Sequence, residues 1–169
     1  MRHRLPLSGL CSVAWLAACA HAPVPVAEDP ASRLVGAWRI VLFEDVDDGR
    51  KSYPFGEKPS GYLLYSADGH MAAVVTDPAA PSCVPPALAQ YSTVAACTPD
   101  QMEQVLERSI VYWGTYSVDA ARGVVIHHVE RDLTSGLAGS HQPRPFRFEG
   151  DLLILGDGKR WIRVFERAR

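Results

Sequence analysis

A succession of short alternating segments, separated by turn residues, limits most strongly how this chain can fold. From residue 34 onward, apolar and polar side chains alternate in short runs, and clusters rich in Gly, Asp and Ala separate the runs. Alternation with a period of two is typical of strands that bury one face. The expected strands are residues 34–44, 61–66, 70–76, 110–118, 124–131, 145–149, 152–155 and 161–166. Short turns join antiparallel neighbours, so the sequence predicts an all-β antiparallel meander that closes as an up-and-down barrel.

One insertion interrupts this meander. Residues 77–97 are rich in Pro and Ala, and Thr98 then begins a helix signal. A threonine cap followed by Pro99 and Gln101 forms a capping box with a proline at the first helical position. We therefore expect one short helix that ends near Arg108. The loop before it is expected to act either as a lid over the barrel mouth or as a flap over an open sheet edge.

The first eighteen residues have the pattern of a secretory signal. Arg2 and Arg4 precede an apolar stretch, which is shorter than the roughly 20 residues that a membrane-spanning helix needs. A basic start, a short apolar middle and a small-residue exit are typical of a cleaved signal peptide. The exit, Leu16-Ala17-Ala18-Cys19, resembles a bacterial lipobox, in which the cysteine is lipidated and becomes the mature N-terminus.

This resemblance implies where the protein is located in the cell and how the chain divides into a signal peptide, a tether and a folded domain. We expect residues 1–18 to be a lipoprotein signal peptide and residues 19–32, with a lipidated Cys19, to be a proline-rich tether. The folded domain is then residues 33–169. Several acyl chains anchor firmly, because each buried methylene adds about 0.8 kcal/mol. Ala20 rather than aspartate follows the cysteine, which in this pattern favours the outer membrane of the bacterial cell envelope, facing the periplasm.

The charge balance excludes one class of partner. The chain has 17 basic and 19 acidic residues, and loss of Arg2 and Arg4 with the signal makes the mature part about four charges negative. Nucleic-acid binding needs a clustered basic face, so we expect no nucleic-acid partner. About 150 mature residues suit one domain with a sizeable core, which we expect to be a monomer.

The cysteines fit an oxidising compartment. Cys11 leaves with the signal and Cys19 carries the lipid, so Cys83 and Cys97 are the pair that remains. A disulfide between them would stabilise the fold by about 3 kcal/mol in the chain-entropy model. The alternative, free or metal-binding thiols, lacks further ligands at zinc spacing. We therefore expect a structural disulfide in the inserted loop.

Several ordered motifs resemble a known family. Gly36-Ala37-Trp38 is similar to the Gly-x-Trp signature of the lipocalins and the wider calycin group. The following motifs are Tyr53-Pro54-Phe55-Gly56, Gly61-Tyr62-Leu63-Leu64-Tyr65, Ala67-Asp68-Gly69-His70-Met71, Tyr112-Trp113-Gly114-Thr115-Tyr116, His127-His128-Val129 and Gln142-x-Arg144-x-Phe146. Together they resemble the lipocalin-like domain family over nearly all of residues 34–168. The cysteine-bearing loop and residues 133–141, which lack aromatic side chains, depart from the family pattern.

The resemblance implies a lipocalin-like barrel and a closed end for it. In such folds the Trp of the signature closes one end of the barrel, and an Arg near the end of the last strand packs over its ring. The matching residues here are Gly36, Trp38 and Arg167, with Arg163 as the second candidate for the arginine. The family has no single activity, so the resemblance implies a fold more than a function.

Histidines are the candidates for chemistry in the folded domain. Adjacent strand residues point to opposite faces, so only one of His127 and His128 can face the interior. That histidine and His70 could meet there as an acid–base or metal pair. A metal site would need further ligands such as Glu44 or Glu130. We expect no metal, because three or four convergent ligands are not evident. We also expect no catalytic residue and no cofactor, because the sequence contains no nucleophile elbow, phosphate-binding glycine loop or paired-carboxylate motif.

The sequence therefore favours a binding barrel. An eight-stranded barrel has just enough interior for side chains or for one small ligand. The expected partner is a small apolar or amphipathic molecule, held by Tyr65, His70, Trp113, Tyr116, His127 or His128, and Arg144. Tyrosine hydroxyls and Arg144 could meet a ligand carboxylate or enolate. The two alternatives are an acid–base enzyme of the isomerase or cyclase type and a filled barrel that acts as an interaction module.

Overall fold

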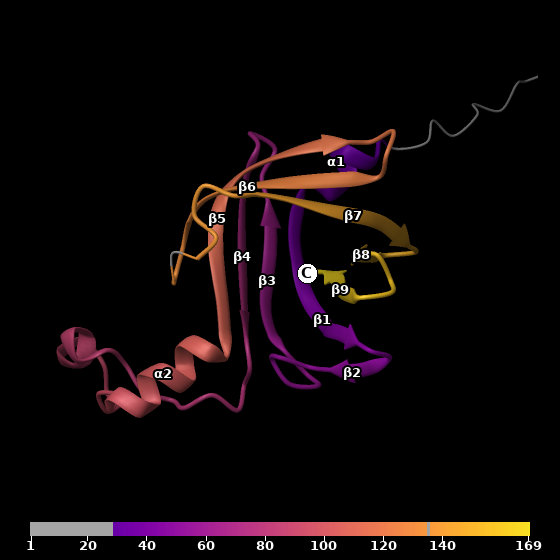
Figure 1. Cartoon of the computed structure of the whole chain (residues 1–169). Coiled ribbons are helices and arrows are strands. Elements are labelled where there is room, and N and C mark those ends of the chain that lie inside the picture. Colours follow the sequence, from indigo (N-terminus) through magenta and orange to yellow (C-terminus); the bar gives the residue numbers. More distant parts are fainter. Residues whose placement is uncertain (1–28, 135) are drawn as a thin grey trace, which may run out of the picture.

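Strands dominate the computed structural model, which describes residues 29–134 and 136–169 (Figure 1). The expected signal peptide, Cys19 and most of the tether lie outside the described residues. The strands are β1 (Gly36–Asp47), β2 (Arg50–Ser52), β3 (Ser60–Tyr65), β4 (His70–Thr76), β5 (Ser109–Asp119), β6 (Val124–Asp132), β7 (His141–Glu149), β8 (Leu152–Leu155) and β9 (Trp161–Arg167). The helices are α1 (Pro30–Leu34), the 3₁₀ helix η1 (Pro86–Tyr91) and α2 (Pro99–Glu107). In the described part of the chain, no helix is long and apolar enough to span a membrane.

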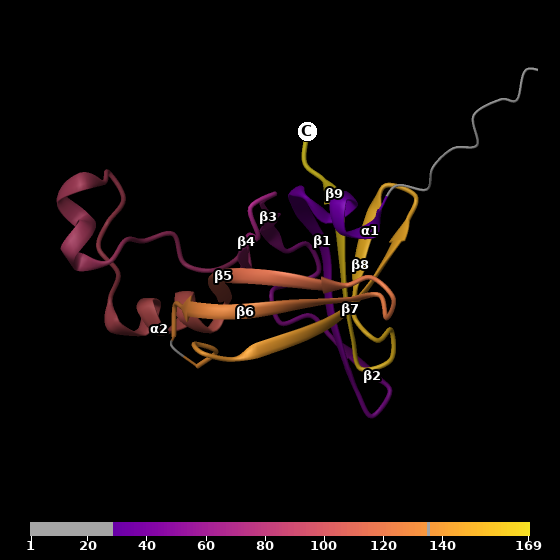
Figure 2. The ribbon, with the colours of Figure 1, turned by 90° about the horizontal axis from the view of Figure 1, so that it is seen from above.

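The strands form one closed antiparallel barrel, as expected. Their order in the sheet is β2-β1-β3-β4-β5-β6-β7-β8-β9, and β1 also pairs with β9. The β1–β9 register runs from Trp38 opposite Arg167 to Asp45 opposite Trp161, with one irregularity near Ile40. Eight strands therefore close the barrel, while β2 extends the far end of β1 as a hairpin (Figures 1 and 2). Closure leaves each long strand paired on both sides.

Three expected strand boundaries differ from the structure by more than one residue: the two ends of β1, which runs to Asp47 rather than to residue 44, and the start of β7. Residues 30–34 form a helix because Asp29 caps the amide of Ala31 and Pro30 occupies the first turn, so β1 begins at Gly36. β7 begins at His141 rather than at residue 145. Pro143 and Pro145 interrupt the apolar pattern, but both are exposed and lie within the ladder to β6. The sequence patterns did not predict β2 or η1.

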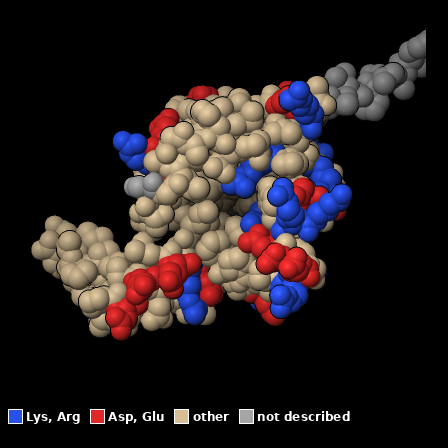
Figure 3. All heavy atoms as spheres, in the orientation of Figure 1, with Lys and Arg blue, Asp and Glu red and all other residues tan. Residues whose placement is uncertain are grey.

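The inserted loop forms an arm that extends away from the barrel (Figures 1 and 2). The capping box of α2 is present, with the Thr98 hydroxyl accepting from the Gln101 amide. The expected disulfide joins Cys83 and Cys97, whose Cα atoms lie 5.0 Å apart. Residues 78–99 contain no charged side chain, and the acidic row beside the arm in Figure 3 belongs to α2. Because the barrel is closed, the arm covers no open sheet edge.

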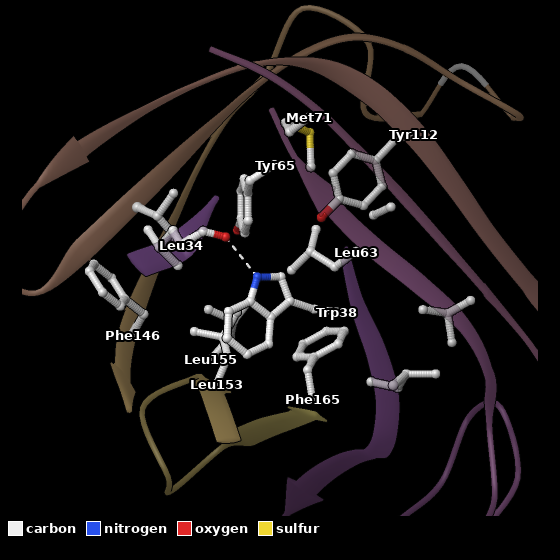
Figure 4. Close-up of a cluster of buried hydrophobic side chains, with 14 of the residues drawn as sticks. Leu34, Trp38, Leu63, Tyr65, Met71, Tyr112, Phe146, Leu153, Leu155 and Phe165 are labelled. Carbon is white, nitrogen blue, oxygen red and sulfur yellow. Dashed lines mark hydrogen bonds between the residues drawn. The ribbon is translucent and has the colours of Figure 1, made fainter. Parts of the chain in front are cut away.

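The core is centred on Trp38. Its ring is 1% exposed, and its Nε1–H donates to the Leu34 carbonyl at 2.7 Å. Figure 4 shows Leu153, Leu155, Phe165 and Tyr65 around this ring, with Tyr112 farther from it, beyond Leu63. The α1 turn thus inserts Leu34 into one end of the barrel and fixes the tryptophan there.

A cavity with one polar side inside the barrel

The end of the barrel that holds Trp38 is sealed. The Arg167 guanidinium lies 4.2 Å from the centroid of the Trp38 ring, which is the contact that the Gly-x-Trp resemblance implies. Its two terminal nitrogens donate to the carbonyls of Val35 and Arg33, at 3.0 and 2.8 Å. Gly36 has a φ of +135°, and a Cβ there would lie 2.6 Å from the Arg167 Nη1 atom. A side chain at position 36 would therefore displace the arginine.

Beyond the core lies a cavity of about 130 Å³. Most of its wall is apolar, and strands from all round the barrel contribute. The lining residues are Phe43, Leu63, Ala73, Val75, Ile110, Tyr112, Arg144, Leu155, Trp161, Arg163 and Phe165. None of them comes from the disulfide-linked arm, so the arm does not form part of the cavity wall. The lining contains three polar residues, namely Tyr112, Arg144 and Arg163.

The two arginines of the cavity have different surroundings. Arg163 donates to Asp45 Oδ1 at 2.6 Å and to the Glu44 carbonyl, and its guanidinium lies 3.3 Å from the centroid of the Phe43 ring. Arg144 lies 5.2 Å from the centroid of Trp161. It forms no ion pair with any carboxylate in the described ranges. Arg163 is therefore neutralised by its protein contacts, whereas the charge of Arg144 is not.

A buried histidine links two tyrosines next to the cavity. His127 is fully buried, and its Nε2 and Nδ1 atoms lie 2.6 Å from the Tyr65 hydroxyl and 2.9 Å from the Tyr112 hydroxyl. Burial, helped by Arg144 and His128, lowers the pKa of His127 to about 3, so the ring is neutral at physiological pH. Burial also raises the pKa of both tyrosines. The neighbouring charge of Arg144 offsets part of that rise at Tyr112.

Four residues from the sequence-predicted site lie in or beside the interior. Arg144 lines the cavity, and Tyr65 and His127 are buried behind Tyr112. Tyr116 packs on the Tyr65 ring with centroids 4.7 Å apart, and its hydroxyl donates to the Ser66 carbonyl. Among these four, only Arg144 lines the cavity, and His127 contacts the wall through its hydrogen bond to Tyr112.

The other three predicted residues lie outside the barrel. His70 is exposed and sits 3.2 Å from Asp68, because Met71 and Ala73 occupy the inward positions of β4. Trp113 is 45% exposed, since Tyr112 and Gly114 face inward on β5. His128 contacts Ser117 and His141 on the outer face of β6. His70 and the inward histidine therefore do not meet, so the acid–base or metal pair that the sequence left open does not form, and His70, Trp113 and His128 do not line the cavity as expected.

Sequence reasoning missed part of the cavity wall. The sequence pattern placed Tyr112 only among the tyrosines whose hydroxyls could meet a ligand, and it did not assign Phe43, Trp161 or Phe165 to the site. The alternation of faces along a strand could have identified Tyr112, because Tyr112 and Tyr116 point to one face and Trp113 points to the other. No group of three potential metal ligands occurs among residues 29–134 and 136–169.

Comparison with known proteins agrees with the fold. A sequence model of the lipocalin-like domain matches residues 35–164, which is most of the chain. The match includes the Gly-x-Trp motif, every lining residue of the cavity except Phe165, and the Tyr65–His127–Tyr112 group. No curated protein matches the chain.

Proposed function

The chain belongs to the lipocalin-like domain family, and from this premise we propose that it binds one small apolar or amphipathic molecule inside the barrel. The observation that carries the proposal is the cavity between Leu63, Val75 and Phe165, which has an apolar wall and one polar side. Apolar pockets with a few placed polar groups are typical of small-molecule sites. A barrel that acted only as an interaction module would need no such space.

The volume of the cavity limits the size of the ligand. Pockets for drug-sized molecules measure about 300–1,000 Å³, whereas this cavity measures about 130 Å³. An engineered apolar cavity of about 150 Å³ in another protein binds benzene. The expected ligand is therefore about as large as a single aromatic ring or a short acyl chain. A larger molecule would have to extend out of the barrel.

The interior histidine does not favour the acid–base alternative. That function needs an interior histidine that reaches the ligand, with His70 as a possible partner, but His127 does not line the cavity and His70 is exposed on the outer face. His127 is fully buried, and both of its ring nitrogens are hydrogen-bonded to tyrosine hydroxyls. A ring whose pKa is about 3 is also a weak base at neutral pH. Binding is thus the function that the geometry supports best.

The N-terminal sequence supports a proposal for the cellular location of the protein. We place the barrel on a lipid anchor at Cys19, in the bacterial envelope and on the periplasmic side of the outer membrane. Metabolic labelling with an alkyne fatty acid should modify the wild-type chain and leave Cys19→Ser unlabelled and outside the membrane fraction. Equal labelling of both chains would contradict lipidation at this cysteine.

Two adjacent alanines of β4 provide a matched test of ligand binding. Ala73 is buried and lines the cavity, whereas Ala72 is only half-buried and does not line it. Ala73→Leu should fill the space, and Ala72→Leu should leave it open. The full-length protein is extracted from its own membrane and examined by native mass spectrometry for a bound small molecule.

The two variants give opposite expected results. Wild type and Ala72→Leu should retain a bound molecule, and Ala73→Leu should lose it while its circular dichroism spectrum remains that of a folded barrel. A wild-type protein without any bound molecule, which also fails to bind added toluene or benzoate, would overturn the proposed function.

A further inference from the structure

The polar side of the cavity offers hydrogen-bond donors and no acidic group. Its members are the Tyr112 hydroxyl and the guanidinium groups of Arg144 and Arg163. None of the lining residues is Asp or Glu. The terminal nitrogens of Arg163 donate to Asp45 and to the carbonyls of Glu44 and Ile162, so its charge is paired with the Asp45 carboxylate. The charged group left for a ligand is therefore the Arg144 guanidinium, which lies beside the Tyr112 phenol.

The direction of the Tyr112 hydroxyl follows from the buried histidine. Among the described residues, the Tyr65 hydroxyl has one hydrogen-bond partner, His127 Nε2. A buried hydroxyl that did not donate to this nitrogen would leave its hydrogen without an acceptor, which costs about 1–3 kcal/mol. Tyr65 therefore donates to Nε2, and the neutral ring carries its own hydrogen on Nδ1.

That tautomer leaves one hydrogen for the cavity. The Nδ1–H group donates to the oxygen of Tyr112, at 2.9 Å. The hydrogen of the Tyr112 hydroxyl then needs another acceptor, and Tyr112 lines the cavity. Tyr65, His127 and Tyr112 thus form a chain of hydrogen bonds that all point in one direction, with its last donor available to a ligand.

Arg144 adds a positive charge beside this donor. It lies close enough to Tyr112 to affect the pKa of the phenol, and it forms no ion pair within the described ranges. A guanidinium group is a planar fork that suits the two oxygens of a carboxylate. The rest of the cavity wall is apolar, so a suitable ligand has a small apolar body and one anionic end.

We propose that the ligand carries a carboxylate, which Arg144 and the Tyr112 hydroxyl bind, while Tyr65 and His127 act as positioning residues that orient this hydroxyl. The proposal rests on the proposed function, because it specifies the chemical class of the molecule bound in the same cavity. An amine would place a second cation beside Arg144, and an uncharged hydrocarbon would leave the Tyr112 hydrogen without an acceptor.

Three probes with the same ring separate these possibilities. Benzoate, benzylamine and toluene are titrated into the full chain, by calorimetry or by NMR where the heat is small. Benzoate should bind about tenfold to a hundredfold more tightly than toluene, as expected for a hydrogen bond to a charged group. Benzylamine should bind most weakly. If toluene binds as well as benzoate, the carboxylate proposal fails and the proposed function stands. If no probe binds, the carboxylate proposal fails, and the proposed function fails with it when the extracted wild-type protein also holds no bound molecule.

Variants of the polar side assign the effect to its residues. Arg144→Met and Tyr112→Phe should each weaken benzoate binding by about tenfold or more and leave toluene binding unchanged. Arg147→Met is the matched control, because Arg147 lies on the same strand, is exposed and pairs with Glu149. Equal benzoate affinity in Arg144→Met and Arg147→Met would overturn the role of Arg144.

The positioning role has its own signature. Tyr65 does not line the cavity, yet Tyr65→Phe removes the donor that holds the tautomer and should weaken benzoate binding, by less than Tyr112→Phe does. The ¹⁵N chemical shifts of the His127 ring identify the protonated nitrogen, which should be Nδ1 in the wild type. A hydrogen on Nε2 instead, or unchanged benzoate affinity in Tyr65→Phe, would overturn the proposed orientation.

Discussion

Each end of the barrel interior has an arginine close to a tryptophan ring, but the two arginines differ in their protein partners. At the closed end, Arg167 lies over Trp38 and donates to two backbone carbonyls. At the cavity, Arg144 lies near Trp161 and has no ion-pair partner among the described residues. The first arginine is satisfied by the protein itself. The second has donors left for another molecule.

This difference shows how one fold separates stability from binding. The closed end is dense, because α1 inserts Leu34 and fixes the Trp38 ring with a hydrogen bond. The other end keeps an unfilled space whose wall is lined by Phe43 and Trp161. Substitutions at the closed end should therefore change the free energy of unfolding. Substitutions of the free polar groups at the cavity should change ligand affinity.

The largest expected effect is the loss of Trp38. Trp38→Ala removes a fully buried ring and should lower the free energy of unfolding by about 3–5 kcal/mol, measured by urea denaturation. Trp113→Ala is the control, because that ring is 45% exposed on the outer face, and it should cost about 1 kcal/mol or less. Similar losses in the two variants would contradict the central role of Trp38.

The buried imidazole should make stability depend on pH. Folding lowers the pKa of His127 from 6.5 to about 3, so between these values the unfolded chain binds a proton that the barrel does not. Above about pH 6.5 both states hold a neutral ring and His127 has no effect. As the pH falls toward about 3, the free energy of unfolding should decrease by up to about 1.4 kcal/mol per pH unit.

Two histidine variants test this pH dependence. His127→Gln should flatten the decrease in unfolding free energy between about pH 6.5 and about pH 4. His70→Gln is the control, because it removes an exposed histidine outside the barrel, and it should flatten the decrease less than His127→Gln does. The prediction fails if the slope of His127→Gln equals that of the wild type.

A smaller effect is expected at the glycine of the closed end. Gly36→Ala combines a positive φ with a Cβ 2.6 Å from the Arg167 guanidinium, and should cost about 1–3 kcal/mol. Gly69→Ala has a positive φ as well, but nothing lies within 4 Å of the added atom. Gly69→Ala should therefore lower the free energy of unfolding by less than Gly36→Ala does, as measured by thermal or chemical denaturation. If Gly69→Ala lowers the free energy of unfolding more than Gly36→Ala does, the contact with Arg167 is not the cause of the loss.

Much of the fold could be predicted because the strands follow a simple period. Alternation and turn residues located eight strands, and the capping box located α2. The boundaries failed where local chemistry overrides the pattern, at the Asp29 cap and at the two prolines of β7. The direction of the arm was not predictable, because a charge-free loop held by a disulfide carries no pattern that specifies what it packs against.

The site was predicted less well, and the reasons differ among residues. Strand parity could have excluded Trp113, because Tyr116 lies three residues away and so faces the other side. Parity could also have assigned His127 inward, since Val125 and Val129 share its face and are buried. Whether Arg144 or Arg163 keeps free donors depends on contacts with β1, such as that of Asp45, which the sequence alone does not reveal.

The most direct test exchanges the two arginines for methionine in turn and measures both properties of each variant. Arg167→Met should lower the free energy of unfolding by about 1–2 kcal/mol, because two carbonyls and the Trp38 ring lose their partner. Its benzoate affinity should equal that of the wild type. Arg144→Met should keep the wild-type stability within about 0.5 kcal/mol and lose about tenfold or more in benzoate affinity. The account would be contradicted if Arg167→Met lost the affinity and Arg144→Met lost the stability.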